Sequence, residues 1–275
     1  MKKIRFGDMR WPEIAEVLKM SNVVILPRGA TEQHGRHLPV NFDYYSATYQ
    51  AEQAARRVTD AGETHVLIAP TIPYGEAFGM PPFKQMLPGT ITVTSDTVIR
   101  LVKDVVRSLI VQGFRNIFVV NGHAENNAPV DVALRELSIE FKDMESLGLF
   151  ATSTFFLGAE AWNEISKGGR TAQGHAGERE TAIAVAIEPE NVQPGVVYEG
   201  TRISSLPAKY VTPFCRELVF CHTRLGGVRD SGVMVADPNA TKEMGEQCVT
   251  AVVNDLVEII TAIAKSEGMA HKDKL

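Results

Sequence analysis

The chain is poor in cysteine. Among its 275 residues only Cys215, Cys221 and Cys248 are cysteines, and no two of them stand in a C-x-x-C spacing. Such a set supports neither a disulfide framework nor a thiolate zinc site. We therefore expect three reduced thiols, each most simply explained as a packed side chain.

The chain also lacks long runs of basic residues and long runs of apolar residues. The 28 basic residues are outnumbered by 33 acidic ones, for a net charge of -5, and they form no basic stripe, so nucleic acid is not an expected partner. No segment has the about 20 consecutive apolar residues that a membrane span needs, and the N-terminus lacks the apolar stretch of a signal peptide. We expect a cytoplasmic protein with no membrane partner.

Sequence motifs of two large enzyme classes are absent. A serine hydrolase would carry a G-x-S-x-G elbow, and a nucleotide-binding enzyme would carry a P-loop or a G-x-G-x-x-G turn after a strand. The chain has none of these, and it has no internal repeat. With 44% hydrophobic residues, it can form one large core. We predict a single domain over residues 1–265, followed by a polar tail at 266–275.

The hydrophobic pattern alternates between strand-like and helix-like segments. Runs rich in Val, Ile and Leu occur at 22–27, 65–70, 116–120 and 149–155, and a segment with helical periodicity follows each of them. This alternation predicts an α/β fold in which helices cover a mainly parallel sheet.

Two helices can be delimited from the sequence. The clearer one is predicted over Ser95–Gln112, with Ser95 as its N-cap and Gly113 as its C-terminal stop. The last helix is predicted to start after Asp237-Pro238-Asn239 and to continue to about Lys265.

Two of the predicted strands run into motifs rich in histidine and carboxylates. The first strand leads into LPRGATEQHGRHLPVNFD, which contains Glu32, His34 and Asp43, and the third leads into NGHAE, which contains His123 and Glu125. Because parallel strands end at the same edge of a sheet, and ligands bind there, we expect these five side chains to converge.

The five residues form a ligand set for divalent metal ions. Two histidines, two glutamates and an aspartate without cysteine suit Zn²⁺ or Mn²⁺, with iron as a further candidate. Five ligands for two ions require one bridging carboxylate, for which we choose Asp43. A water between two such ions would lose a proton near neutral pH and attack a carbonyl. The sequence thus predicts a two-metal hydrolase of a small molecule; the non-enzyme alternative is a metal-stabilised binding or scaffold protein.

The motifs LPRGATEQHGRHLP…D, NGHAENN…DVALREL and GHAGERETA together resemble the creatininase (creatinine amidohydrolase) family. They occur in the family's order, and the resemblance covers nearly the whole chain. It implies a three-layer αβα fold, a binuclear metal centre, hydrolysis of small molecules and a homo-oligomer, most often a hexamer.

The resemblance also implies roles for individual residues. It puts Glu32 and His123 on one ion, His34 and Glu125 on the other, and Asp43 between them. His175 in GHAGERET matches a family histidine that shuttles protons between the attacking water and the leaving group, a task that suits histidine near pH 7. The structural alternative for His175 is a helix cap.

Two further carboxylates follow His175 in the sequence. Glu178 and Glu180 lie at the start of a predicted helix, where the helix dipole alone favours acidic residues. Each is a candidate additional ligand or a partner of a ligand, and Glu180 is the better one.

The substrate is not identified by these motifs. Creatinine-hydrolysing members carry tryptophans around the flat ring, whereas this chain has Thr171 near one such position and Phe155 or Phe156 near the other, with Ala124 inside the His-x-Glu pair. An amide-type C–N bond in a small cyclic molecule is the leading prediction. The alternative within the family is hydrolytic C–C ring opening of a cyclic keto-inositol.

Two long segments carry residues that could face a pocket or a second subunit. Their apolar side chains motivate the prediction of a homo-oligomer, whereas lids over the chain's own site are the alternative. These segments are Pro70–Gly89 and Thr201–Val233, and the side chains predicted for the contact are Phe78, Met80, Phe83, Phe214 and Phe220. The residues that could line a pocket are His37, which lies outside these segments, Tyr74, Phe78, His222 and Arg224.

Overall fold

The computed structural model describes residues 2–77, 87–168, 174–193 and 239–270. The described elements, in chain order, are η1 (Phe6–Asp8), α1 (Trp11–Leu18), β1 (Val23–Arg28), α2 (Phe42–Asp60), β2 (Leu67–Ile68), α3 (Ser95–Gln112), β3 (Asn116–Asn121), η3 (Ala124–Asn126), α4 (Asn127–Glu140), β4 (Gly148–Ser153), α5 (Ala159–Ile165), α6 (Glu178–Ile187), η5 (Pro189–Asn191) and α7 (Lys242–Ala270).

The four strands form a parallel sheet in the order β2-β1-β3-β4. β1 is paired along its whole length with β3, from Val23 opposite Asn116 to Arg28 opposite Asn121, and β3 is paired in the same way with β4. Each strand lies inside or next to one of the four apolar runs of the sequence. The prediction of an α/β fold with a parallel sheet is therefore confirmed.

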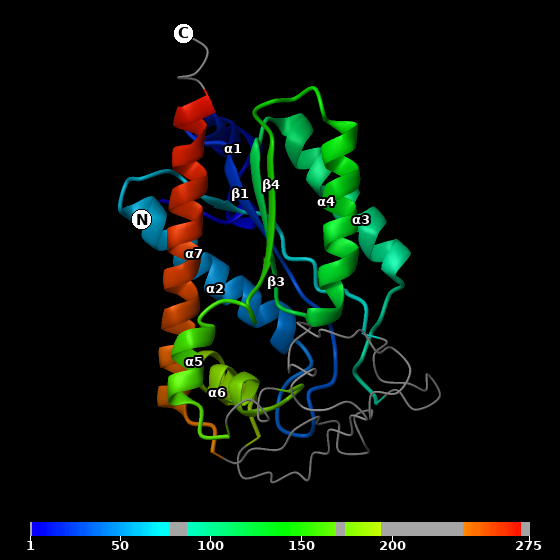
Figure 1. Cartoon of the computed structure of the whole chain (residues 1–275), viewed down its shortest axis with the longest axis vertical. Helices are drawn as coiled ribbons and strands as arrows, with labels where there is room; N and C mark the ends of the chain where they lie inside the picture. The colour runs from blue at the N-terminus through cyan, green and yellow to red at the C-terminus, as the bar shows by residue number, and fades with distance from the viewer. Residues whose placement is uncertain (1, 78–86, 169–173, 194–238, 271–275) are drawn as a thin grey trace.

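Helices cover both faces of this sheet. Alternate side chains of β1 point to opposite faces: Ile25 packs in a core with α2, α6 and α7, whereas Val24 packs in a second core with α3 and α4. Figure 1 shows the resulting three layers, with α7 and α2 on one side of the strands and α3 and α4 on the other. The carboxyl ends of the strands and the first turns of α2 and α4 lie toward the lower part of the same view.

The helix α3 has the predicted bounds but a different cap. Its N-cap is Thr94, whose hydroxyl accepts a hydrogen bond from the Thr97 N–H, so the prediction of Ser95 as the cap was wrong by one residue. Ser95 instead donates its hydroxyl to the Glu76 carboxylate. Gly113 ends the helix with φ of 116°, a left-handed conformation that glycine adopts without strain.

The helix α7 is longer at its end than the sequence predicted. It begins at Lys242 and continues to Ala270, so the predicted boundary at residue 265 does not end it, and half of the predicted tail is helical. By length and composition alone, Lys242–Lys265 would qualify as a membrane span. The core helix of a soluble protein passes the same test, and α7 buries Cys248, Val252 and Leu256 in the core with α2 and α6.

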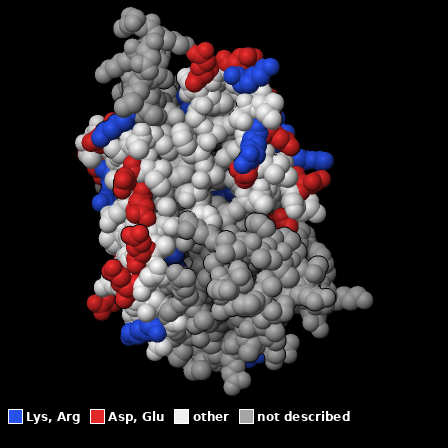
Figure 2. Space-filling view, viewed as in Figure 1, with Lys and Arg blue, Asp and Glu red and all other residues white. Residues whose placement is uncertain are grey.

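Charged side chains of both signs lie on the outer surfaces of the helices. Figure 2 shows a column of acidic side chains along α7 and mixed charges over α3 and α4. The α3–α4 pair carries the ion pairs Lys103–Glu136 and Arg107–Glu140. Exposed ion pairs of this kind add little stability, about 0–1 kcal/mol each.

Several expectations fall outside the described residues. Cys215 and Cys221 do so, and so does the segment 201–233, whereas Cys248 is a free, buried thiol as expected. The division into one domain and a tail stays a prediction.

Candidate metal centre

The first turn of α2 lies directly against the ends of β1 and β3. A Cβ atom on Gly29 would lie 2.4 Å from the Tyr44 nitrogen, and one on Gly122 would lie 2.1 Å from the Asp43 carbonyl oxygen. Real Cβ atoms do not approach other atoms so closely, so only glycine allows this packing. The two glycines thereby bring Asp43 next to the residues that follow each strand.

Asp43 stands between two histidines in the buried centre. Its Oδ1 lies 3.1 Å from His34 Nε2, and its Oδ2 lies 2.8 Å from His123 Nδ1. Glu32 Oε2 lies 3.2 Å from the same His123 nitrogen. Glu32, Asp43 and His123 thus form one group of potential ligands whose facing atoms are all within 4.8 Å of one another.

A second group lies on the other side of Asp43 and includes a residue from α6. Glu180 Oε2 is 3.6 Å from His34 Nε2, and its carboxylate also accepts a hydrogen bond from the Ala176 N–H, a contact of 2.5 Å. His34, Asp43 and Glu180 together could hold a metal ion, and all three are buried. Asp43 belongs to both groups, which is the arrangement expected of a bridging carboxylate.

Backbone carbonyl groups orient the histidines of the centre. His34 Nδ1 lies 3.0 Å from the Glu32 carbonyl oxygen, and His123 Nε2 lies 2.6 Å from that of Glu76. Because a carbonyl oxygen only accepts hydrogen bonds, the nitrogen that faces it carries the proton. The other ring nitrogen then faces the carboxylates, and once it has lost its proton its lone pair can bind a metal ion, as in metal-binding histidines.

His175 follows the same rule. Its Nε2 lies 2.6 Å from the Gln33 carbonyl oxygen, with the Gln33 amide nitrogen 3.0 Å away, and the shorter contact favours a proton on Nε2. Its Nδ1 then faces Glu32 Oε2 at 3.7 Å. The ring centroids of His175 and His34 are 4.3 Å apart, so His175 lines the centre beside the second group.

The pKa values of the centre reflect buried carboxylates whose negative charge is not balanced by enough positive charge. Burial raises the pKa of Glu32 to about 8 and that of Glu180 to about 7. Burial lowers the pKa of His34, but the carboxylates of Asp43 and Glu180 outweigh it and raise that pKa to about 10. Burial, together with the positive charge of His34, holds the pKa of His175 well below its ordinary value.

The donor set fits divalent cations. Glu32 Oε2, His34 Nε2 and Asp43 Oδ2 are buried and, although they lie at ion-pair distance from neighbours, make no hydrogen bond. Buried polar atoms normally have a partner, so orphaned atoms that face one another need an explanation. Imidazole and carboxylate ligands around a shared carboxylate suit Zn²⁺ or Mn²⁺.

Two of the predicted carboxylates lie outside these groups. Glu125 Oε2 is 3.8 Å from His123 Nε2, the ring nitrogen opposite the one that faces Asp43, whereas the carboxylate of Glu180 lies 3.6 Å from His34 Nε2. Glu178 accepts hydrogen bonds from Ser166 Oγ and the Lys167 N–H, and it belongs to none of the groups. A ligand role for Glu125 stays a prediction.

The residues predicted to line a pocket differ in location and exposure. His37 is buried against α6, with Nε2 at 2.9 Å from Thr181 Oγ1, and burial lowers its pKa to about 4. Tyr74 is 44% exposed. Thr171, Phe78, His222 and Arg224 lie outside the described residues, and Phe155 and Phe156 lie in the turn after β4.

Sequence reasoning missed three residues that support the centre. Gln33 and Glu76 supply carbonyl groups to His175 and His123, and Asn126 holds Glu76 in place. Backbone carbonyls carry no sequence signal. Asn126 alone could have been found, as the polar residue that ends the NGHAEN motif.

The chain matches the model of the creatininase family, described as creatinine amidohydrolase, over residues 7–260. It is 32% identical to a creatinine amidohydrolase of Pseudomonas putida over 142 residues, which are 50% of this chain and 52% of that protein, so the match spans about half of the relative. It is 28% identical to a mycofactocin precursor peptide peptidase of Mycobacterium ulcerans, with 86% and 84% covered. A 3-dehydro-scyllo-inosose hydrolase of Thermotoga maritima is 27% identical, with 68% and 57% covered.

Solved structures have the same fold. A putative creatinine amidohydrolase from Bacteroides fragilis superposes with a TM-score of 0.77 at 26% identity, covering 96% of this chain and 97% of that one. A creatininase described as a manganese form reaches a TM-score of 0.74 at 24% identity, covering 94% and 98%.

Proposed function

The chain belongs to the creatininase family, whose members are metal-dependent hydrolases, and we propose that it holds two divalent ions and hydrolyses an amide-type C–N bond in a small molecule. The observation that carries the proposal is the position of Asp43. Its two carboxylate oxygens face different histidines, and each histidine shares a further carboxylate with it. Family membership sets aside the alternative of a scaffold without enzymatic activity.

The proposed ligands are divided between two ions. Glu32, Asp43 and His123 would hold one ion, and His34, Asp43 and Glu180 would hold the other. Glu125 stays a predicted ligand of the His34 ion, as the family resemblance implies. Zn²⁺ and Mn²⁺ fit this donor set best, and a related creatininase structure is described as a manganese form. When bound, such ions lower the pKa of water toward 7 and polarise a carbonyl group.

His175 is the proposed proton carrier. The Gln33 carbonyl oxygen holds the proton of Nε2, so Nδ1 has the free lone pair, and Nδ1 faces the centre. Nδ1 can accept a proton from the attacking water and pass it to the leaving nitrogen as the C–N bond breaks. The low pKa of His175 keeps the ring neutral near pH 7, so that Nδ1 carries no proton before the reaction.

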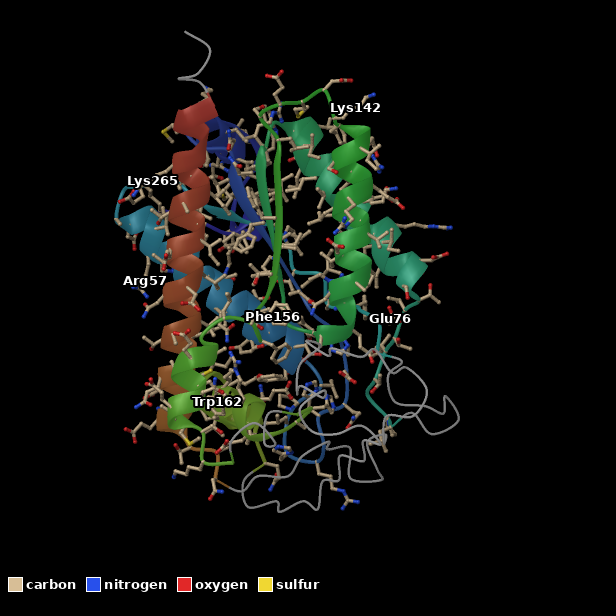
Figure 3. The ribbon with its side chains drawn as sticks, in the orientation of Figure 1. Arg57, Glu76, Lys142, Phe156, Trp162 and Lys265 are labelled. Atoms are coloured by element: carbon tan, nitrogen blue, oxygen red, sulfur yellow. The ribbon has the colours of Figure 1, made fainter. Side chains whose placement is uncertain are left out.

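The positions of the tryptophans in the chain argue that the substrate is not a flat, creatinine-like ring. The sequence has two tryptophans. Trp162 on α5 (Figure 3) is buried in the core with residues of α2, α6 and α7, and Trp11 is 80% exposed at the start of α1. We therefore propose that the substrate differs from that of the creatinine-hydrolysing members.

A cyclic keto-inositol is the second candidate substrate. The relative from Thermotoga maritima, an inosose hydrolase, favours it. The same activated water would attack a ring ketone, and a C–C bond would break in place of the C–N bond. A polyol would fit a pocket that lacks tryptophans and offers polar groups.

A substrate panel tests the proposal. The protein, purified with Zn²⁺ or Mn²⁺, is incubated with creatinine, a formamidopyrimidine, a short peptide and an inosose, and products are followed by mass spectrometry. Addition of one water to an amide substrate is the expected result. Turnover of the inosose alone would favour the second candidate, and metal content below two ions after supplementation would overturn the two-ion centre.

A further inference from the structure

The side chain of Asn126 joins three segments that surround the centre. Its Nδ2 donates to the Gly29 carbonyl oxygen at 3.0 Å and lies 3.3 Å from Asn121 Oδ1, and its Oδ1 accepts from the Glu76 N–H at 3.0 Å. Asn126 is fully buried. One amide group therefore links the end of β1, the end of β3 and the segment that follows β2.

Glu76 connects Asn126 to His123 through two hydrogen bonds made by its backbone. The Glu76 N–H binds Asn126, and the Glu76 carbonyl oxygen accepts from His123 Nε2 at 2.6 Å. Figure 3 shows Glu76 at the foot of α4, which Asn126 precedes. Since the Glu76 carbonyl fixes the proton on Nε2, it also aims His123 Nδ1 at Glu32 and Asp43.

Among the described residues, no ligand on the other side of the centre receives its orienting hydrogen bond from Asn126 or Glu76. His34 is oriented by the carbonyl group of Glu32, two residues away in its own segment. Glu180 is held by the Ala176 N–H, which precedes α6. Neither contact passes through Asn126 or Glu76.

We propose that Asn126 is a positioning residue for one side of the metal centre only, the side formed by Glu32, Asp43 and His123. It acts through the Glu76 carbonyl group, which holds the ring of His123 in its metal-binding orientation. The inference rests on the proposed two-ion centre. Outer hydrogen bonds of this kind change metal affinity about 10–100-fold.

Titration of the two ions tests the inference. Zn²⁺ is added to the metal-free protein in the presence of a chromophoric chelator that competes for the ion, which gives the affinity of each of the two binding steps. The step that is lost in Glu180→Gln is the one on the His34 side. Asn126→Ala is expected to weaken the other step about 10–100-fold and to leave the His34-side step within about threefold. Ser95→Ala is the matched control, because it also removes a hydrogen bond to Glu76, but from the carboxylate.

A second variant keeps the test informative if Asn126→Ala does not fold. Gly75→Ala places a Cβ 2.6 Å from both polar atoms of the Asn126 side chain. It should push the Glu76 segment away from Asn126 and weaken the same binding step. Circular dichroism and thermal melting confirm the fold of each variant.

A spectroscopic measurement separates positioning from general loss of stability. In ¹⁵N-resolved NMR spectra of the zinc-loaded protein, the His123 Nε2–H signal should be protected from exchange, and Asn126→Ala should remove this protection while the His34 Nδ1–H signal stays. Equal weakening of both ions, or unchanged affinity, would overturn the role of Asn126. Fewer than two ions in the wild-type protein would instead overturn the proposed centre itself.

Discussion

Asp43 is the residue on which both ligand groups depend. Removing its charge should empty both positions, whereas Glu180→Gln should empty only one, because Glu180 faces His34 and not His123. We expect Asp43→Asn to lower the metal content from about two ions to below one, measured by elemental analysis after dialysis. Asp60→Asn, at the exposed end of the same helix, is the control and should keep both ions. Retention of two ions by Asp43→Asn would refute a bridging role.

His175 gives a prediction about turnover without a change in metal content. His175→Ala should lower kcat about 10²–10⁴-fold, the range for a positioned acid or base, on whichever substrate the panel identifies. His65→Ala, a histidine that binds only the Lys3 carbonyl in the described residues, should have no effect. Because His175 also forms a group with Glu32 and His34, loss of an ion in His175→Ala would make it a ligand instead.

Metal affinity should rise with pH. In the metal-free protein Glu32 and Glu180, with pKa values of about 8 and about 7, are protonated below this range, and His34 keeps its proton up to about pH 10. An ion must displace these protons, so binding weakens as pH falls through 8 and 7 and strengthens as pH rises toward 10. Calorimetry in buffers of different ionisation enthalpy should detect the released protons. Binding that does not change between pH 6 and 9 would contradict this coupling.

At the scale of elements, the centre depends on the contact between α6 and α7. A Cβ on Gly245 would lie 1.9 Å from the Ala182 carbonyl oxygen, so α7 lies against the backbone of the helix that carries Glu180. Arg179 and Glu178 in the first turn of α6 hold the turn after β4 and the segment after α5. This turn therefore fixes two neighbouring segments as well as a proposed ligand.

Gly245→Ala should separate α6 from α7. We expect a loss of about 1–3 kcal/mol in the free energy of unfolding, as for an overpacked core, together with weaker binding of the ion on the His34 side. Denaturant unfolding and the zinc titration measure the two effects. Gly7→Ala, where a Cβ meets nothing within 4 Å, is the control. Unchanged stability in Gly245→Ala would mean that the helices can move apart freely.

At the scale of the whole molecule, the assembly stays a prediction. The aromatic residues that motivated it, such as Phe78 and Phe214, lie outside the described residues. Among the described residues, Trp11, Met20, Val111 and Ile139 are more than 70% exposed. Light scattering should give a closed oligomer, and the family resemblance favours six chains of 30.1 kDa. A stable monomer at micromolar concentration would leave the alternative in which these segments are lids over the chain's own site.

The cytoplasmic location is also a prediction, and fractionation of the producing cells would test it.

The sequence by itself predicted the parts of the molecule that depend on local signals. Apolar runs predicted the four strands, and periodicity with a terminal glycine predicted the helix Ser95–Gln112. Glu32, His34, Asp43 and His123 could be proposed together because parallel strands end at one edge of the sheet. The structure brings these four together.

Only the tertiary structure decided which carboxylates reach the cluster. Glu178 and Glu180 are two residues apart on a helix, about 200° around its axis, so only one of them can face His34, and the docking of α6 on α7 selects Glu180. Glu125 lies in the 3-10 turn η3 rather than in an extended strand, so it does not project beside His123 toward Asp43. Contacts between segments distant in sequence set both outcomes, and a local pattern carries no information about them.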